Sequence, residues 1–141
     1  MQLQGGKRRQ IRLRRHAYDY EQYTNVLYPI PYNPPFVDAD NPVAVYETIY
    51  KVDKKSGRYY LITEGVDSAY FLRVNGVDIG YATGSHLTHE YDLTDVLKEG
   101  DNKVRITVFK WCSGTYLECQ DKFRLSGIFR DVYILRRPED H

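Results

Sequence analysis

The sequence contains few cysteines and no long apolar segment. Its two cysteines, Cys112 and Cys119, are too few for the disulfide framework of a small secreted domain. No run reaches the roughly 18–20 apolar residues that a membrane-spanning helix needs, so we expect no membrane partner. No apolar stretch follows the basic residues near Met1, so we expect no signal peptide in this chain. These absences leave a cytoplasmic and a periplasmic location both open.

Acidic residues are missing from the beginning of the chain, where the first is Asp19. The same segment is rich in basic residues, namely Lys7, Arg8, Arg9, Arg12, Arg14 and Arg15. Like charges without apolar periodicity are typical of a solvated segment, so we expect residues 1–17 to form a disordered basic arm. Binding of nucleic acid through this arm is an alternative. No zinc-finger spacing, aromatic RNP pattern or Gly-x-x-Gly clamp accompanies the arm, so we do not favour that alternative.

The common catalytic signatures are also missing. The chain has no nucleophile elbow, no phosphate-binding loop and no zinc-binding His-Glu-x-x-His sequence. His86 and His89 are three residues apart and could ligate a metal only with a carboxylate such as Glu90, and we interpret them as loop residues. We therefore assign no catalytic residue to this chain.

Aromatic residues are abundant. The 141 residues include 14 tyrosines and five phenylalanines, and hydrophobic residues make up 42% of the chain. Tyrosine favours strands and keeps a hydroxyl for a wet edge, so a tyrosine-rich β domain could present a surface to sugars. The length and composition predict one globular domain, residues 18–138, followed by a short tail, residues 139–141.

The distribution of turn-forming residues is that of an all-β protein. All prolines except Pro138 lie between residues 29 and 42, a stretch that should run extended and outside any central strand. Strands are predicted at residues 43–52, 58–63, 69–74, 77–81, 103–111 and 128–135. Asn75-Gly76 suits a type I′ hairpin turn, because both residues tolerate a positive φ. One or two helical turns are predicted at residues 92–98, capped by Asp92 or Thr94.

Residues 113–127 join the last two predicted strands and have little regular pattern. Connections of this length are often functional. The loop contains two carboxylates, Glu118 and Asp121, and a carboxylate can accept two sugar hydroxyls or bind a hard cation. The alternative is a salt-bridged loop that only holds the strand ends together.

Several motifs, in order and spacing, resemble the N-terminal sugar-binding domain of family-two β-galactosidases. The opening segment contains YTNVLYPIP at residues 23–31, NPPFV at 33–37 and Asn41-Pro42. The middle strands contain GVDSAY at residues 65–70, VNG at 74–76 and IGY at 79–81. The last loop and strand contain WCSGTYLECQD at residues 111–121 and SGIFRDV at 126–132. The resemblance covers residues 18–138.

The resemblance implies a jelly-roll, galactose-binding-domain-like β-sandwich that belongs to a larger glycoside hydrolase. In that family the catalytic glutamates and the magnesium ligands lie in a barrel that this chain lacks. Asn33 matches an asparagine that reaches into the galactose pocket, and Asp121 matches an aspartate that contacts sugar and helps to hold sodium. The implied partners are a galactoside substrate and the rest of the parent enzyme, which is expected to be a homo-oligomer.

The sequence departs from the family pattern at one point, and one alternative function stays open. The opening strand of the family, Leu-x-Gly-x-Trp-x-Phe, is missing, so we expect one sheet to lack an edge partner. A free-standing carbohydrate-binding module, with Tyr32, Tyr81 or Tyr116 as a stacking platform, is the alternative to a domain of a β-galactosidase.

Overall fold

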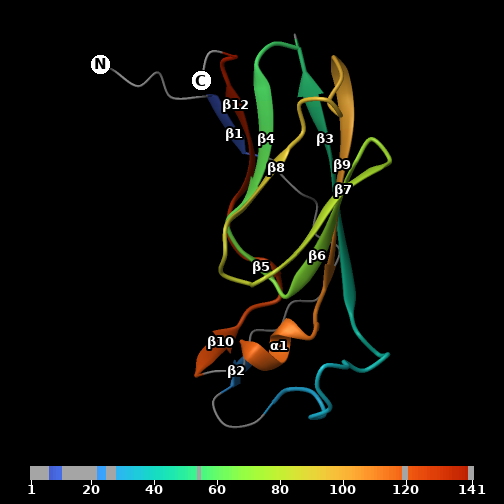
Figure 1. Ribbon diagram of the computed structural model, residues 1–141, viewed down its shortest axis with the longest axis vertical. Coiled ribbons are helices and arrows are strands. Elements are labelled where there is room, and N and C mark those ends of the chain that lie inside the picture. Colours follow the sequence, from blue (N-terminus) through green and yellow to red (C-terminus); the bar gives the residue numbers. More distant parts are fainter. Residues whose placement is uncertain (1–6, 11–21, 25–27, 54, 119–120, 140–141) are drawn as a thin grey trace, which may run out of the picture.

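The computed structural model describes residues 7–10, 22–24, 28–53, 55–118 and 121–139. Two four-stranded antiparallel sheets face each other and confirm the predicted all-β sandwich (Figure 1). The first sheet has the strand order β1 (Lys7–Gln10), β12 (Val132–Arg137), β4 (Arg58–Thr63) and β8 (His89–Asp92). The second has the order β3 (Val43–Val52), β9 (Gly100–Phe109), β6 (Ala69–Val74) and β7 (Val77–Thr83).

Smaller elements lie at one end of the sandwich. The short helix α1 (Gly114–Leu117) follows β9, and two short antiparallel pairs lie near it: β10 (Lys122–Arg124) with β2 (Gln22–Thr24), and β11 (Gly127–Ile128) with β5 (Val66–Asp67). No helix among the described residues is long and apolar enough to cross a membrane.

Alternating side chains of the two sheets make the core. Along β9, Val104, Ile106 and Val108 are buried and point toward the first sheet, while the residues between them are partly or fully exposed. Leu61 and Ile134 from the facing sheet are completely buried. The segments at residues 43–52, 58–63 and 69–74, which are rich in β-branched and aromatic residues, form strands where they were predicted.

A chain of hydroxyl groups crosses this core. The hydroxyls of Thr63 and Tyr70 lie 2.7 Å apart, and Tyr91 donates to Tyr70 over 3.0 Å. Burial raises the pKa of both tyrosines, so both hydroxyls stay protonated and able to donate. The network satisfies polar groups that would otherwise be costly inside the sandwich.

The hairpin between β6 and β7 confirms the predicted turn. Asn75 has a φ of 52° and Gly76 a φ of 85°, as a type I′ turn requires. The side chain of Asn75 also reaches across the sandwich end, donating to the Val96 carbonyl over 3.1 Å and accepting from the amide of Lys103 over 3.0 Å. The turn residue therefore also ties the hairpin to β9.

Two expectations need correction. Residues 7–10, which we expected to belong to a disordered arm, form strand β1, which pairs with β12. Backbone hydrogen bonding gives these residues a place that their side-chain pattern does not reveal. The rest of the predicted arm lies outside the described residues. The turn predicted at residues 92–98 is present as a single turn, in which the Leu97 N–H donates to the Leu93 carbonyl and Asp92 accepts the backbone N–H of Thr94. The final strand spans 132–137, because residues 127–128 pair separately with β5.

Candidate functional site

The proline-rich segment and the loop after β9 meet at the end of the sandwich that carries α1 (Figure 1). Tyr116, in α1, is buried and joins them. Its hydroxyl lies 2.9 Å from the carbonyl oxygen of Pro31 and 2.8 Å from that of Phe36, and accepts the backbone N–H of Asn33 over 3.3 Å. The single hydroxyl proton can go to either carbonyl. One tyrosine thus fixes the backbone on both sides of Asn33.

Aromatic rings surround this hydroxyl. Tyr28, Tyr32 and Tyr116 form a cluster with ring centroids 5.1 to 5.9 Å apart. Tyr32 is 71% exposed, whereas Tyr116 is 8% exposed and packs beneath it. Of the predicted stacking platforms, Tyr32 therefore presents a ring to solvent here and Tyr116 has a structural position.

A second contact holds the proline-rich segment to the strand before α1. The side-chain amide of Asn41 donates to the Trp111 carbonyl over 2.8 Å and accepts the Trp111 N–H over 3.0 Å. This pair of bonds reproduces the pairing of two strand residues with a side chain in place of one backbone. The segment before β3 is therefore fastened at both of its ends.

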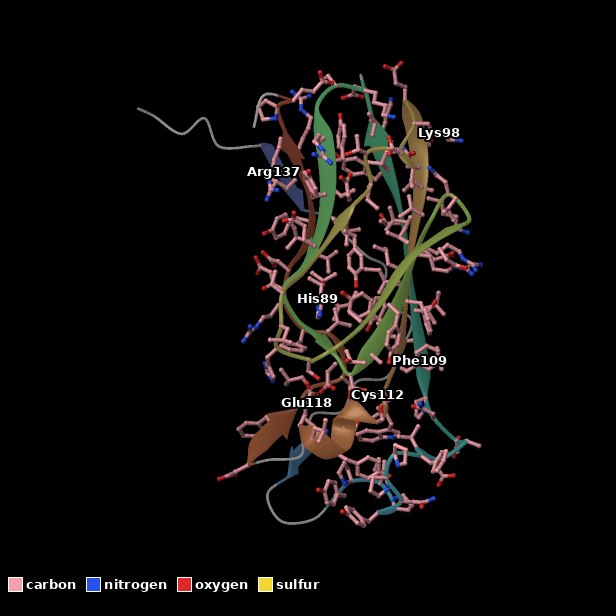
Figure 2. The ribbon with its side chains drawn as sticks, viewed as in Figure 1. His89, Lys98, Phe109, Cys112, Glu118 and Arg137 are labelled. Carbon is pink, nitrogen blue, oxygen red and sulfur yellow. The ribbon has the colours of Figure 1, made fainter. Side chains whose placement is uncertain are left out.

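Glu118 fixes the other side of α1. Its carboxylate accepts the backbone N–H of Ser85 over 2.7 Å and lies 2.6 Å from the Ser85 hydroxyl, which is also 3.0 Å from Asp67. Ser85 is completely buried, and Asp67 is 4% exposed. Glu118 and Cys112 both lie at the α1 end, whereas Lys98 and Arg137 lie at the opposite end (Figure 2). Glu118 therefore ties the end of α1 to Ser85 through hydrogen bonds.

Asn33 and Asp121 are both solvent-exposed at this end of the fold. Asn33 lies in the segment fixed by Tyr116, and Asp121 immediately precedes β10. The guanidinium of Arg124, in β10, is buried and donates to the Thr115 carbonyl of α1 over 3.1 Å, which ties β10 to the helix. The two segments that carry the predicted site residues are thus connected through α1.

His86, His89 and Cys112 all lie among the described residues. The parts of the chain that the structure describes contain no group of three His, Cys, Asp or Glu side chains that could hold a metal ion. His86 lies in a loop, as expected, and packs against the ring of Phe129, whereas His89 is not a loop residue but begins β8 and packs against the ring of Tyr70. Cys112 is a buried thiol, and Cys119 lies outside the described residues.

Sequence reasoning alone did not find the roles of Tyr116, Asn41 and Glu118. The signal that could have found Asn41 is its position directly before Pro42 and β3, where a side chain must replace missing backbone partners. No comparable local signal exists for Tyr116, because its partners are 80 or more residues away in the sequence.

Comparison with known proteins identifies the family of this chain. The family model described as "Glycosyl hydrolases family 2, sugar binding domain" matches residues 10–138. The β-galactosidase of Actinobacillus pleuropneumoniae is 49% identical to this chain over 126 residues, and that of Staphylococcus xylosus is 48% identical over 124 residues. The aligned parts cover 89% and 86% of this chain but only 12% of each relative.

The fold is similar to solved glycosidase structures. A β-glucuronidase from Ruminococcus gnavus superposes with a TM-score of 0.67 over 99% of this chain and 30% of its own, at 17% identity. The sandwich thus corresponds to a small part of larger enzymes. The chain belongs to glycosyl hydrolases family 2, as the sugar-binding domain of that family.

Proposed function

We propose that this chain is a non-catalytic domain of a β-galactosidase, in which it contributes Asn33 and Asp121 to the rim of the substrate pocket. Relatives named β-galactosidase at nearly half identity support the choice of substrate, a terminal β-galactoside. The observation that carries the proposal is the Tyr116 hydroxyl, which fixes the Asn33 segment against α1.

The two rim residues have the chemistry that a sugar requires. An amide such as that of Asn33 both donates to and accepts from hydroxyl groups, and a carboxylate such as that of Asp121 accepts from two of them. A rigid β scaffold that presents both on loops at one end is a common arrangement for ligand binding. The tyrosines beside Asn33 add apolar faces with polar tips.

Catalysis in the parent would come from outside this domain. A retaining glycosidase uses a carboxylate nucleophile and a carboxylic acid, and we expect the remaining polypeptide to supply that pair together with its magnesium. Asp121 would provide one ligand to a sodium ion. One carboxylate offers at most two of the roughly six oxygen ligands that a hard cation such as calcium takes, so we expect other domains to complete the site.

A chimeric enzyme tests this proposal. Residues 10–138 would replace the matching segment of the A. pleuropneumoniae β-galactosidase, whose high identity favours a compatible core. We expect the chimera to hydrolyse a nitrophenyl β-galactoside, and the isolated chain to show no turnover above background. Asn33→Ala and Asp121→Ala should each lower kcat/KM by about 10- to 100-fold, as expected for a loss of about 1.4–2.7 kcal/mol of binding.

Asp40→Ala is the matched control, because Asp40 is an exposed carboxylate in the same proline-rich segment. It should leave kcat/KM unchanged. Unchanged kinetics in both Asn33→Ala and Asp121→Ala would contradict the rim assignment, and turnover by the purified isolated chain would contradict its non-catalytic role.

A further inference from the structure

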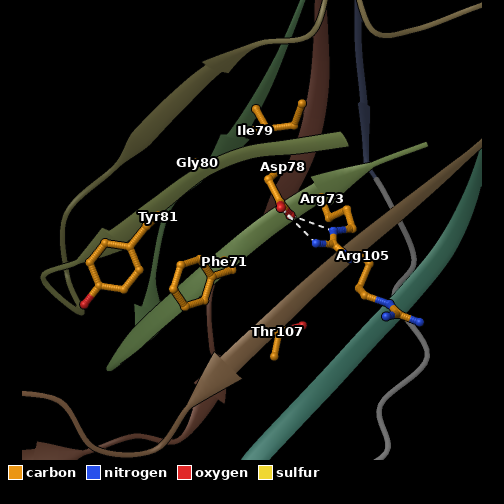
Figure 3. Close-up of a pocket in the computed structure, with 8 residues that line it drawn as sticks. All are labelled: Phe71, Arg73, Asp78, Ile79, Gly80, Tyr81, Arg105 and Thr107. Atoms are coloured by element: carbon orange, nitrogen blue, oxygen red, sulfur yellow. Dashed lines mark hydrogen bonds and ion pairs between the residues drawn. The ribbon is translucent and has the colours of Figure 1, made fainter. Parts of the chain in front are cut away.

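A groove of about 600 Å³ lies on the outer face of the second sheet. Its lining includes Phe71 and Arg73 of β6, Asp78 and Tyr81 of β7, and Arg105 and Thr107 of β9 (Figure 3). None of these residues belongs to the rim described above. The groove therefore needs an explanation of its own.

The register of the strands arranges this face in rows. One row crosses all four strands and consists of Val45, Thr107, Phe71 and Tyr81. The adjacent row on the same face consists of Glu47, Arg105, Arg73 and Asp78. Residues two apart along a strand share a face of the sheet. The row that contains Phe71 and Tyr81 therefore lies directly beside a row of charged side chains.

A β-bulge shapes the groove at its edge strand. Leu72 pairs with Gly80, but the next residue, Arg73, pairs with Asp78, so Ile79 is an extra residue on β7. Bulges bend a strand and redirect side chains, and they are frequent beside binding sites. This bulge separates Tyr81 from Asp78 and lets both line the same depression.

Two aromatic rings of the groove are accessible to solvent. Phe71 is 47% exposed and Tyr81 is 51% exposed, and their ring centroids are 4.9 Å apart with an angle of 45° between the planes. Phe109 packs edge-on against Phe71 at 5.8 Å. The exposed surfaces of the two tilted rings form a preformed apolar platform, with the hydroxyl group of Tyr81 at one end.

Each charged group beside this platform contacts a partner of opposite charge, and Glu47 is shared between two cations. Arg73 donates to both oxygens of Asp78 over 2.6 and 2.8 Å, as the dashed lines in Figure 3 show. Glu47 accepts from Arg105 over 2.6 Å and from Lys103 over 3.0 Å. Each lining charge therefore has a counter-charge, and planar groups fixed in this way can still bond to hydroxyls with their remaining donors and lone pairs.

We propose that this groove is a second saccharide-binding site, which takes a neutral pyranoside with one C–H face on Phe71 and Tyr81 and its hydroxyls on Arg73, Asp78 and Arg105. A polyanion such as a nucleic acid needs several basic groups, and this face, with three cations against two carboxylates, has an excess of only one positive charge. A wholly apolar partner would remove water from the ion pairs without replacing its hydrogen bonds, and this desolvation costs free energy. A polyhydroxylated ring satisfies both rows at once, and the site goes beyond the pocket rim proposed above.

Titration of the isotope-labelled full chain by NMR tests this site, with β-1,4-linked galactotetraose as the probe. We expect amide shifts to change along β6, β7 and β9, with weak affinity because little area is buried. Tyr81→Ala should weaken binding by about tenfold, and Tyr81→Phe, which keeps the ring, should retain most of it. Leu87→Ala is the control, since Leu87 is 62% exposed and lies in a loop outside the groove.

The two proposals fail independently. Asn33→Ala and Asp121→Ala should leave these shift changes intact, and Tyr81→Ala should leave the kcat/KM of the chimera unchanged. No shift changes on β6, β7 and β9 with galactotetraose would overturn the second site. Stronger binding of the charged probe tetragalacturonate would overturn its preference for neutral sugars, and concentration-dependent dimers that Tyr81→Ala abolishes would identify the face as a contact between copies.

Discussion

At the scale of single residues, Asn102 stabilises the end of the sandwich near Lys98. Its side chain is completely buried, accepts from the Lys98 amide over 2.9 Å and from the Asn75 amide over 2.8 Å, and donates to the Lys98 carbonyl over 2.8 Å. No other residue type offers both donors and acceptors in this shape.

We predict that Asn102→Ala lowers the free energy of unfolding by about 3 kcal/mol, because several backbone groups lose their buried partner at once. Urea denaturation measures this loss. The exposed neighbour gives the control, and Asp101→Ala should change the stability by less than about 0.5 kcal/mol. A similar small effect for both variants would contradict the role assigned to Asn102.

The hydroxyl group of Tyr116 holds the backbone segment that carries Asn33, a residue of the proposed rim. Tyr116→Phe removes only the hydroxyl that contacts Pro31, Asn33 and Phe36. We predict a loss of about 1–2 kcal/mol in unfolding free energy and faster amide exchange at Asn33, while exchange in β9 stays slow. Unchanged exchange at Asn33 would show that the segment is held by other contacts.

Asp92 gives the molecule an acid-sensitive contact. Hydrogen bonds from Thr94, and then the guanidinium of Arg58 at 2.8 Å, hold the pKa of Asp92 below its usual value. A carboxyl whose pKa is lower in the folded state stabilises the fold above its unfolded pKa, near 4, and loses this contribution as the pH falls further.

Asp92→Asn should therefore flatten the dependence of unfolding free energy on pH between about pH 4 and pH 2, relative to the parent chain. Denaturation series across that range measure the slope. Equal slopes in the two proteins would show that Asp92 does not contribute to the acid sensitivity.

At the scale of elements, the central strands could be predicted from sequence and the peripheral ones could not. Strands 43–52 and 58–63 have β-branched and aromatic residues between polar turns, so local pattern and tertiary position agree. β1 and α1 have no such pattern, since Lys7–Gln10 is wholly polar and Gly114–Leu117 is a single turn. Partners distant in sequence determine them.

Strand β1 gives a direct test of that dependence. Deleting residues 1–10 removes the edge strand and exposes β12, so we predict a lower Tm, faster amide exchange in Val132–Arg137 and a greater tendency to aggregate. Deleting residues 1–6 alone is the control and should leave exchange in β12 unchanged. Equal exchange after both deletions would contradict the pairing of β1 with β12.

At the scale of the whole molecule, the candidate site depended on resemblance more than on local chemistry. Asn33 and Asp121 are 88 positions apart in the sequence, and neither has a motif that signals sugar binding by itself. The same holds for the groove, where Tyr81 was one of three candidate platforms and only the register of β6, β7 and β9 set it beside Arg73 and Asp78. Spacing along the chain does not encode such neighbours.

The most direct test of the central claim is a crystal structure of the chimeric β-galactosidase with galactose bound. We expect side-chain atoms of Asn33 and Asp121 within about 3.2 Å of galactose hydroxyls or of a cation that contacts the sugar. Both side chains in a domain contact remote from the sugar, with the pocket rim built wholly by other domains, would contradict it.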